Sequence, residues 1–335
     1  MWRNSEFVEF VEWMKQKNIR SDSRCTFFGM DLYSLRRSMS AVISYLERES
    51  PDLAGRARER YACFDPSGGR GDVYGYQASF DFDEGCRAAV EAQLEELQLL
   101  AEQLANSDGR ASQDAYFYAE QNALLVRNAE LYYRAVYSGR IDSWNVRDTH
   151  MADTIERLLE FLSRRTPDPR IIVWAHNSHL GDASATEMGQ RGELNVGQLV
   201  RLRHHSRAFS LGFTTYDGSV IAANDWDGPH SVRAVRPALP ESYEALFHEI
   251  GLPNFLVTFA GDERLSAAFR SERLERAIGV IYRPETERYS HYFSARLADQ
   301  FDAVLHFDET RGVEPLPHAE EEQTAEVPET YPVGV

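Results

Sequence analysis

The stretch Ile171-Ile-Val-Trp-Ala-His-Asn-Ser-His-Leu-Gly-Asp-Ala183 decides the fold prediction for this chain. Its first five residues are apolar and predict a buried central strand. Two histidines, an asparagine, a glycine and an aspartate follow this strand at once. Because open α/β sheets bind ligands beyond the carboxyl ends of their strands, this order predicts a functional site directly after residue 175.

Other short apolar segments alternate with helical patterns along the chain. We predict further strands at residues 26–30, 208–215, 220–223, 232–235, 255–258, 277–282 and 301–307. Apolar residues at helical spacing predict three long helices, at about residues 84–104, 113–137 and 147–164. The glycine-rich stretch 65–83 predicts a long loop.

This alternation predicts an α/β protein with a mostly parallel sheet flanked by helices and with a large helical insertion. We expect residues 1–315 to form a single domain whose helical layer spans about residues 84–164. Residues 316–335 are polar and acidic, and they are expected to form a disordered tail.

Composition excludes several partners. The net charge of -17 argues against nucleic acid, because binding to phosphates needs a basic surface. No apolar run is long enough to cross a bilayer, and the first residues lack a signal-peptide pattern, so we expect a cytoplasmic protein with no membrane contact. The three cysteines, Cys25, Cys63 and Cys86, are odd in number and form no CxxC pair, so neither a disulfide framework nor a cysteine zinc site is expected.

The strongest catalytic candidates are His176 and His179, three residues apart in the predicted loop. Neutral imidazole is the natural general base near pH 7, so one ring could take a proton while the other orients a substrate oxygen. A metal pair is the second interpretation, but it needs a third ligand that no nearby spacing supplies. The plainest alternative is that one histidine only bonds the loop backbone. The pair together with Asn177 favours function.

Four residues are predicted to bind substrate: Asp31, Asn177, Glu187 and His291. Asp31 follows a predicted strand, and it either faces the same crevice or caps the next helix. Glu187 lies in a loop punctuated by glycines, where a solvated surface position is the alternative. No cofactor is expected, and the chain has no GxGxxG or Walker pattern that would indicate a nucleotide site. It also has no GxSxG nucleophile elbow.

Several segments together resemble the erythromycin esterase family, hydrolases of macrolide lactone esters. The most specific are Phe28-Gly-Met-Asp-Leu-Tyr-Ser-Leu35, Trp174-Ala-His-Asn-Ser-His-Leu-Gly-Asp182, Ala277-Ile-Gly-Val-Ile-Tyr-Arg-Pro284 and Phe301-Asp-Ala-Val-Leu-His-Phe-Asp308. The resemblance implies a carboxylic ester hydrolase that acts on a small-molecule ester without metal or acyl-enzyme, and it implies a link to antibiotic resistance. It also implies that His176 and His179 position the substrate and stabilise charge on the ester oxygen.

One family feature has no match in this chain. Family members begin upstream with a strand and a G-E-x-x-H-G motif, whose histidine is taken as the base that activates water. Its absence leads us to expect a chain without its N-terminal portion, through a misplaced start or a real truncation, and weak turnover by the chain as given. A binding protein of the same fold, or a hydrolase of another ester in exopolysaccharide metabolism, are the alternatives.

Overall fold

The computed structural model describes residues 2–21, 24–67, 71–80, 85–104, 110–137, 139–225 and 228–317. These residues fall into two compact units. Among the described residues, one unit combines residues 2–29 with residues 174–317, and the other consists of Met30–Val173. The acidic tail expected over 316–335 lies, from residue 318 on, outside the described residues.

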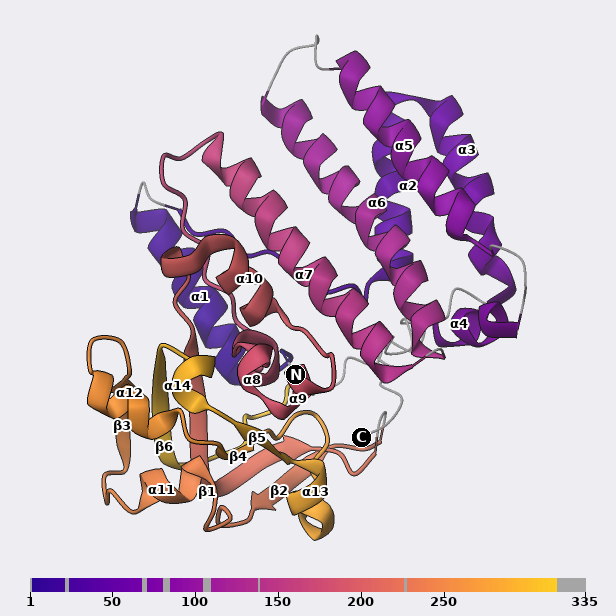
Figure 1. Cartoon of the computed structure of the whole chain (residues 1–335). Coiled ribbons are helices and arrows are strands. Elements are labelled where there is room, and N and C mark those ends of the chain that lie inside the picture. Colours follow the sequence, from indigo (N-terminus) through magenta and orange to yellow (C-terminus); the bar gives the residue numbers. More distant parts are fainter. Residues whose placement is uncertain are drawn as a thin grey trace. The chain divides into compact units, whose positions relative to one another are not determined.

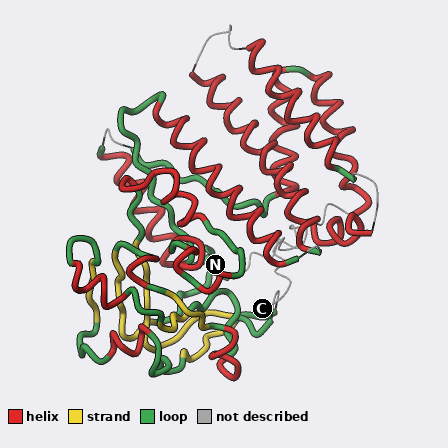
Figure 2. Tube along the Cα trace, viewed as in Figure 1, coloured by secondary structure: helices red, strands yellow, loops and turns green. Residues whose placement is uncertain are grey.

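The Met30–Val173 unit is helical in its described residues (Figures 1 and 2). Its helices are α2 (Leu35–Glu49), α3 (Pro51–Tyr61), η1 (Ala62–Ser67), α4 (Gly71–Phe80), α5 (Arg87–Leu104), α6 (Arg110–Val136) and α7 (Arg140–Ser163). The three long helices predicted from periodicity are thus present as α5, α6 and α7. They form because apolar residues at helical spacing, such as Leu94 and Leu97 of α5, are buried together in one core.

The long loop predicted over 65–83 is wrong, because η1 and α4 occupy much of it. Two of its glycines, Gly71 and Gly75, allow α4 to pack closely against α6. A Cβ at Gly75 would lie 2.2 Å from the carbonyl oxygen of Tyr133, so only glycine lets α4 approach α6 at this point.

A disulfide joins Cys63 to Cys86, a single bond that was not predicted from the sequence, where only a disulfide framework was considered and not expected. The bond connects η1 to the residue before α5, with Cα atoms 5.5 Å apart. The odd cysteine count does not prevent a single pair, and the remaining Cys25 is exposed. The cross-link closes a loop of the helical unit and restricts its unfolded chain.

The other unit contains the sheets of the described structure. Its strands are β1 (Leu211–Ala222), β2 (Ser231–Val235), β3 (Asn254–Thr258), β4 (Arg273–Arg276), β5 (Tyr292–Ala295) and β6 (Ala303–Thr310). The larger sheet has the order β2-β1-β6-β3, and β4 and β5 form a separate antiparallel pair. Only β1 and β6 are parallel, so the described sheet is mixed and not mostly parallel.

Helices and turns surround these strands in the same unit (Figure 1). They are α1 (Ser5–Arg20), α8 (Asn177–Leu180), η2 (Ala183–Ala185), α9 (Glu187–Gln190), α10 (Val196–His204), η3 (His205–Arg207), α11 (Tyr243–His248), α12 (Glu263–Phe269), η4 (Pro284–Thr286), α13 (Glu287–Ser290) and α14 (Leu297–Gln300). An α/β fold with a large helical portion is therefore confirmed.

The central strand predicted at residues 171–175 is not present. These residues form no regular element and pair with no strand among the described residues, and Ile172 is 95% exposed. Trp174 does not face a sheet core; its ring packs edge-on against the rings of Trp2 and Phe10. A segment forms a strand only where a neighbouring strand completes its backbone hydrogen bonds. Residues 171–175 do not pair with the first half of β1, which bonds to β6 on one side and, at Phe213, to the side chain of Asn177.

Two more predicted strands differ from the structure. Residues 26–30 form no strand and are mostly exposed, and residues 277–282 contribute only an isolated bridge between Ile281 and Ala223. The strand of that region, β4, lies earlier, at Arg273–Arg276. The two strands predicted at 208–215 and 220–223 are one long strand, β1. Gly218 lets it continue at a positive φ of 119°, where it lies against Thr310.

Candidate functional site

The two predicted catalytic histidines lie on one short turn. His176 caps α8, and His179 lies inside the helix and is only 9% exposed. Asn177 anchors the start of this turn to β1, because its Nδ2 donates to the carbonyl of Phe213 (2.7 Å) and its Oδ1 accepts from the Phe213 N–H (3.1 Å). An asparagine side chain thus makes the bonds that a neighbouring strand would make.

The ring of His176 is held in one tautomer. Its Nδ1 accepts from the backbone N–H of Ser178 (3.2 Å), so the proton is on Nε2, which donates to the carbonyl of Ile278 (3.1 Å). Burial, together with neighbouring His179, lowers the pKa of His176 to about 4, although the bond to Ile278 opposes this. The imidazole is therefore neutral at pH 7, and both of its nitrogens bond the surrounding backbone.

A residue given no role from the sequence holds the turn from the other side. Asn195 is buried, and its Nδ2 donates to the carbonyls of Ser178 (2.7 Å) and Gly181 (2.5 Å). Its Oδ1 accepts from the N–H groups of Ala183 (3.2 Å) and Gln198 (3.0 Å), the second as the N-cap of α10. The signal was available, because an asparagine before a helical pattern is a typical N-cap.

His291 meets the same segment as His176. Its Nε2 accepts from the Arg283 N–H (2.9 Å), and its Nδ1 donates to the carbonyl of Ala277 (3.3 Å), next to the residue that His176 contacts. Burial lowers the pKa of His291, although the Ala277 carbonyl and Glu287 oppose this. His176 and His291 are thus linked through residues 277–278, and a substrate contact by His291 would replace one of these two bonds.

Glu187 is the first residue of α9 and lies beside β5. Its Oε2 accepts from the Ser294 N–H (3.2 Å), and its Oε1 pairs with Arg191. Although burial opposes it, these two donors hold the pKa of Glu187 below its usual range. The carboxylate is therefore charged at pH 7 and already carries two partners.

Asp31 belongs to the helical unit and not to the unit that carries the histidines. It forms a two-bond ion pair with Arg147 of α7, with distances of 3.0 and 2.7 Å, and the guanidinium also lies 4.6 Å from the centre of the Tyr33 ring. Although burial opposes it, Asp31 raises the pKa of Arg147. From the sequence, Asp31 was expected either to face the crevice or to cap the next helix. Its ion pair with Arg147 was not predicted.

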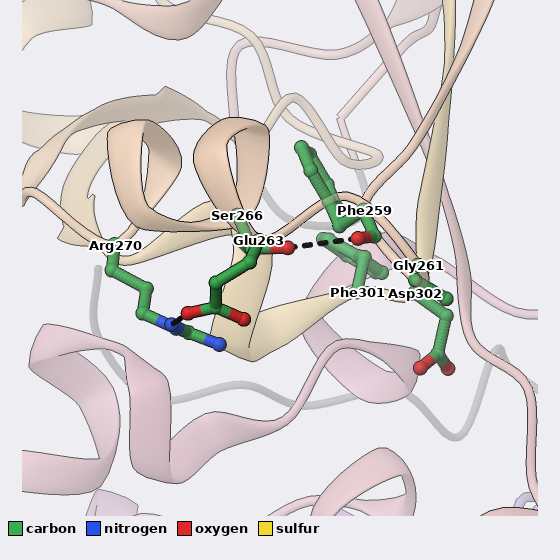
Figure 3. A pocket seen from close by; sticks show the side chains of 9 residues that line it. Phe259, Gly261, Glu263, Ser266, Arg270, Phe301 and Asp302 are labelled. Carbon is green, nitrogen blue, oxygen red and sulfur yellow. Dashed lines mark hydrogen bonds and ion pairs between the residues drawn. The ribbon is translucent and has the colours of Figure 1, made fainter.

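One described cavity lies in the sheet-containing unit, at the carboxyl end of β3 (Figure 3). Its volume is about 450 Å³, and its lining residues are Phe259, Ala260, Gly261, Glu263, Ser266, Arg270, Ala298, Phe301 and Asp302. The hydroxyl of Ser266 donates to the Phe259 carbonyl (2.8 Å), and Arg270 pairs with Glu263 (2.8 Å), as the dashed lines of Figure 3 mark. None of the six predicted site residues lines this cavity.

Within the described residues, no cluster of three or more histidine, cysteine or acidic side chains is arranged to hold a metal ion. In the same residues, no helix combines the length and apolar character needed to cross a membrane.

Comparison with known proteins fits the motifs and the fold. The sequence pattern of the erythromycin esterase family matches residues 1–310. The chain belongs to the erythromycin esterase family. A curated relative, the putative hydrolase YbfO of Bacillus subtilis (strain 168), is 20% identical over 328 residues, which are 91% of this chain and 68% of the relative. Family and relative together support hydrolase chemistry in general.

Solved structures share the fold. A succinoglycan biosynthesis protein aligns with a TM-score of 0.70 at 18% identity, over 94% of this chain and 72% of the other. A Bacillus cereus protein aligns with a TM-score of 0.72 at 17% identity, over 94% and 74%. A variant of the erythromycin esterase EreC in its open conformation aligns with a TM-score of 0.62 at 15% identity, over 93% and 75%.

Proposed function

We propose that the chain is a hydrolase of a small-molecule carboxylic ester, by attack of water on the ester carbonyl with help from an imidazole. The observation that carries this proposal is the placement of His176 and His179 on one anchored turn in a member of the erythromycin esterase family. In the reaction, the water oxygen bonds to the carbonyl carbon, the acyl–oxygen bond breaks, and the water protons end on the released alcohol and in solution.

The two histidines have different roles in this proposal. His176 is neutral, and its nitrogens are engaged with Ser178 and Ile278, so it fixes the turn. His179, three residues on, supplies the imidazole that hydrogen-bonds the ester oxygen as negative charge develops there. Donors aimed at such a developing charge are typically worth about 10²–10³ in turnover. Asn177 sets the orientation of the turn through its two bonds to β1.

The test is an ester panel assayed with purified protein. The panel holds a macrolide lactone, simple nitrophenyl esters and acylated saccharides, because fold resemblance does not choose among them. His179→Ala is expected to lower turnover by about 10²-fold or more, in keeping with the size of such imidazole contributions. The matched control is His230→Ala, which removes an exposed histidine and is expected to leave turnover unchanged.

Two outcomes would overturn the proposal. Full activity in His179→Ala would exclude this imidazole from the reaction. Calorimetric binding of an ester by wild-type protein, with no product formed from any member of the panel, would instead support a binding protein of the same fold.

A further inference from the structure

Two buried glutamates lie under the histidine turn and take no part in the function proposed above. Glu275 of β4 and Glu244 of α11 are 0% and 1% exposed. One oxygen of Glu244 accepts from the backbone N–H of Arg276 (2.9 Å). Among the described residues, neither oxygen of Glu275 makes a hydrogen bond of ordinary geometry. An unsatisfied buried carboxylate is costly, so its state needs a physical account.

The surroundings of Glu275 favour a neutral carboxyl group. Burial, together with the negative charge of Glu244, raises the pKa of Glu275 to about 8, although the side-chain amides of Gln300 and Asn177 oppose this. Burial also raises the pKa of Glu244, although the Arg276 N–H opposes this. Among the described residues, Tyr243 of α11 also interacts electrostatically with Glu275. Phe293 of β5 is the cross-strand partner of Glu275. Ionising both of two neighbouring buried carboxyl groups is energetically unfavourable, so the Glu275–Glu244 pair retains one proton at neutral pH.

Two side-chain amides, those of Asn177 and Gln300, lie against this carboxyl group, and each is placed at one end of α8. Asn177 begins the helix, and its Nδ2 has a second hydrogen beyond the one that it gives to Phe213. Gln300 of α14 packs against Gly181, where an added Cβ would lie 2.7 Å from its Nε2, and its backbone carbonyl accepts from Asp182 N–H (3.0 Å). The buried Oε1 of Gln300 has no donor among the described residues.

These groups complement one another once Glu275 carries a proton. We propose that Glu275 is a positioning residue: its carboxylic O–H donates to Oε1 of Gln300, its carbonyl oxygen accepts the second amide hydrogen of Asn177, and the resulting bridge fixes both ends of the turn that carries His176 and His179. The bridge satisfies all three buried groups. Its effect on turnover rests on the function proposed above, whereas its effect on the turn does not.

The experiment follows the histidine rings and the carboxyl proton between pH 6 and 9.5. In wild-type protein, infrared spectra are expected to show a protonated carboxyl band that disappears near pH 8. Over the same range the ring ¹⁵N signals of His176 and His179 are expected to shift. Glu275→Gln keeps a neutral donor and acceptor of the same shape, so the band and the pH-dependent shift are both expected to be lost while the low-pH ring signals remain.

Two further variants separate positioning from simple packing. Glu244→Gln removes the neighbouring charge, so the carboxyl band of Glu275 is expected to disappear at lower pH. Glu275→Leu fills the space but makes no hydrogen bond, so it is expected to change the ring signals at every pH and to lower turnover at least tenfold more than Glu275→Gln. If Glu275→Leu does not fold, the carboxyl band and the histidine ring signals of Glu275→Gln and Glu244→Gln still test the positioning role of Glu275.

The inference is overturned if wild-type protein shows no protonated carboxyl band at pH 7. It is also overturned if the ¹⁵N signals of His176 and His179 stay unchanged over the pH range in which the carboxyl band disappears. If the ring signals respond but no ester is hydrolysed, the proposed function fails and the positioning role of Glu275 stands.

Discussion

Replacing Asn195 by alanine should destabilise the histidine turn more than any comparable polar substitution near it. The buried amide makes four hydrogen bonds: to Ser178 O, Gly181 O, Ala183 N and Gln198 N. Loss of the helix N-cap costs about 1 kcal/mol. Each of the other three bonds contributes roughly 1 kcal/mol, and alanine offers no replacement partner. The free energy of unfolding should therefore fall by about 3–4 kcal/mol.

The assay is urea unfolding followed by tryptophan fluorescence, with the slope m compared between variants so that a change in midpoint reports stability. Asn195→Ser keeps a capping oxygen and should lose about 1 kcal/mol less than alanine. The control is Asn122→Ala in α6, where the amide makes a single bond to the Tyr118 carbonyl (2.7 Å), so a change within about 0.5 kcal/mol is expected.

A free energy of unfolding of Asn195→Ala within about 1 kcal/mol of wild type would contradict this prediction. That result would mean that the turn relaxes to satisfy its own carbonyls or that water replaces the amide at little cost.

Three other perturbations test separate parts of the structure. Reducing the Cys63–Cys86 bond, which closes a loop over a sequence separation of 23, should lower the free energy of unfolding by about 3 kcal/mol; equal urea midpoints with and without reductant would contradict this. Burial lowers the pKa of His150 to about 4, so as pH falls below about 6.5 the unfolded chain binds a proton at this residue before the folded protein does. The free energy of unfolding should therefore fall by up to about 3 kcal/mol between neutral pH and pH 4. Urea titrations at these two pH values should show a correspondingly smaller fall for His150→Gln. His176→Ala removes the cap of α8 and the partner of the Ile278 carbonyl, so thermal melting should show a loss of about 2 kcal/mol, and an unchanged melting temperature would argue against its structural role.

The sequence predicted best those features that depend on local pattern. The apolar spacing of Leu94 and Leu97 describes a helix face wherever the helix packs, so α5 was found without knowledge of its neighbours. The motif from Trp174 to Asp182 placed two histidines and an asparagine on one turn for the same reason, because the residues adjoin in the chain.

The features that sequence reasoning missed depend on partners distant in the chain. Residues 171–175 have a strand-like composition, but a strand also requires a neighbour that completes its backbone hydrogen bonds. Gly75 is typical of a loop in the sequence, and only its close contact with Tyr133 in the structure explains why a glycine is needed there. Neither the Cys63–Cys86 bond nor the contact of Glu275 with Glu244 leaves a local signal, because each arises only when separate elements pack together.

The aromatic contacts of Trp174 make α1 a remote support of the turn that carries His176 and His179. Its ring meets Trp2 and Phe10 only two residues ahead of His176. Trimming α1, or crowding it with a bulky fusion, would strip that ring of its packing and loosen the chain just where it enters the turn. Handles for purification or labelling are therefore better placed away from α1, even though no residue of this helix is expected to touch an ester.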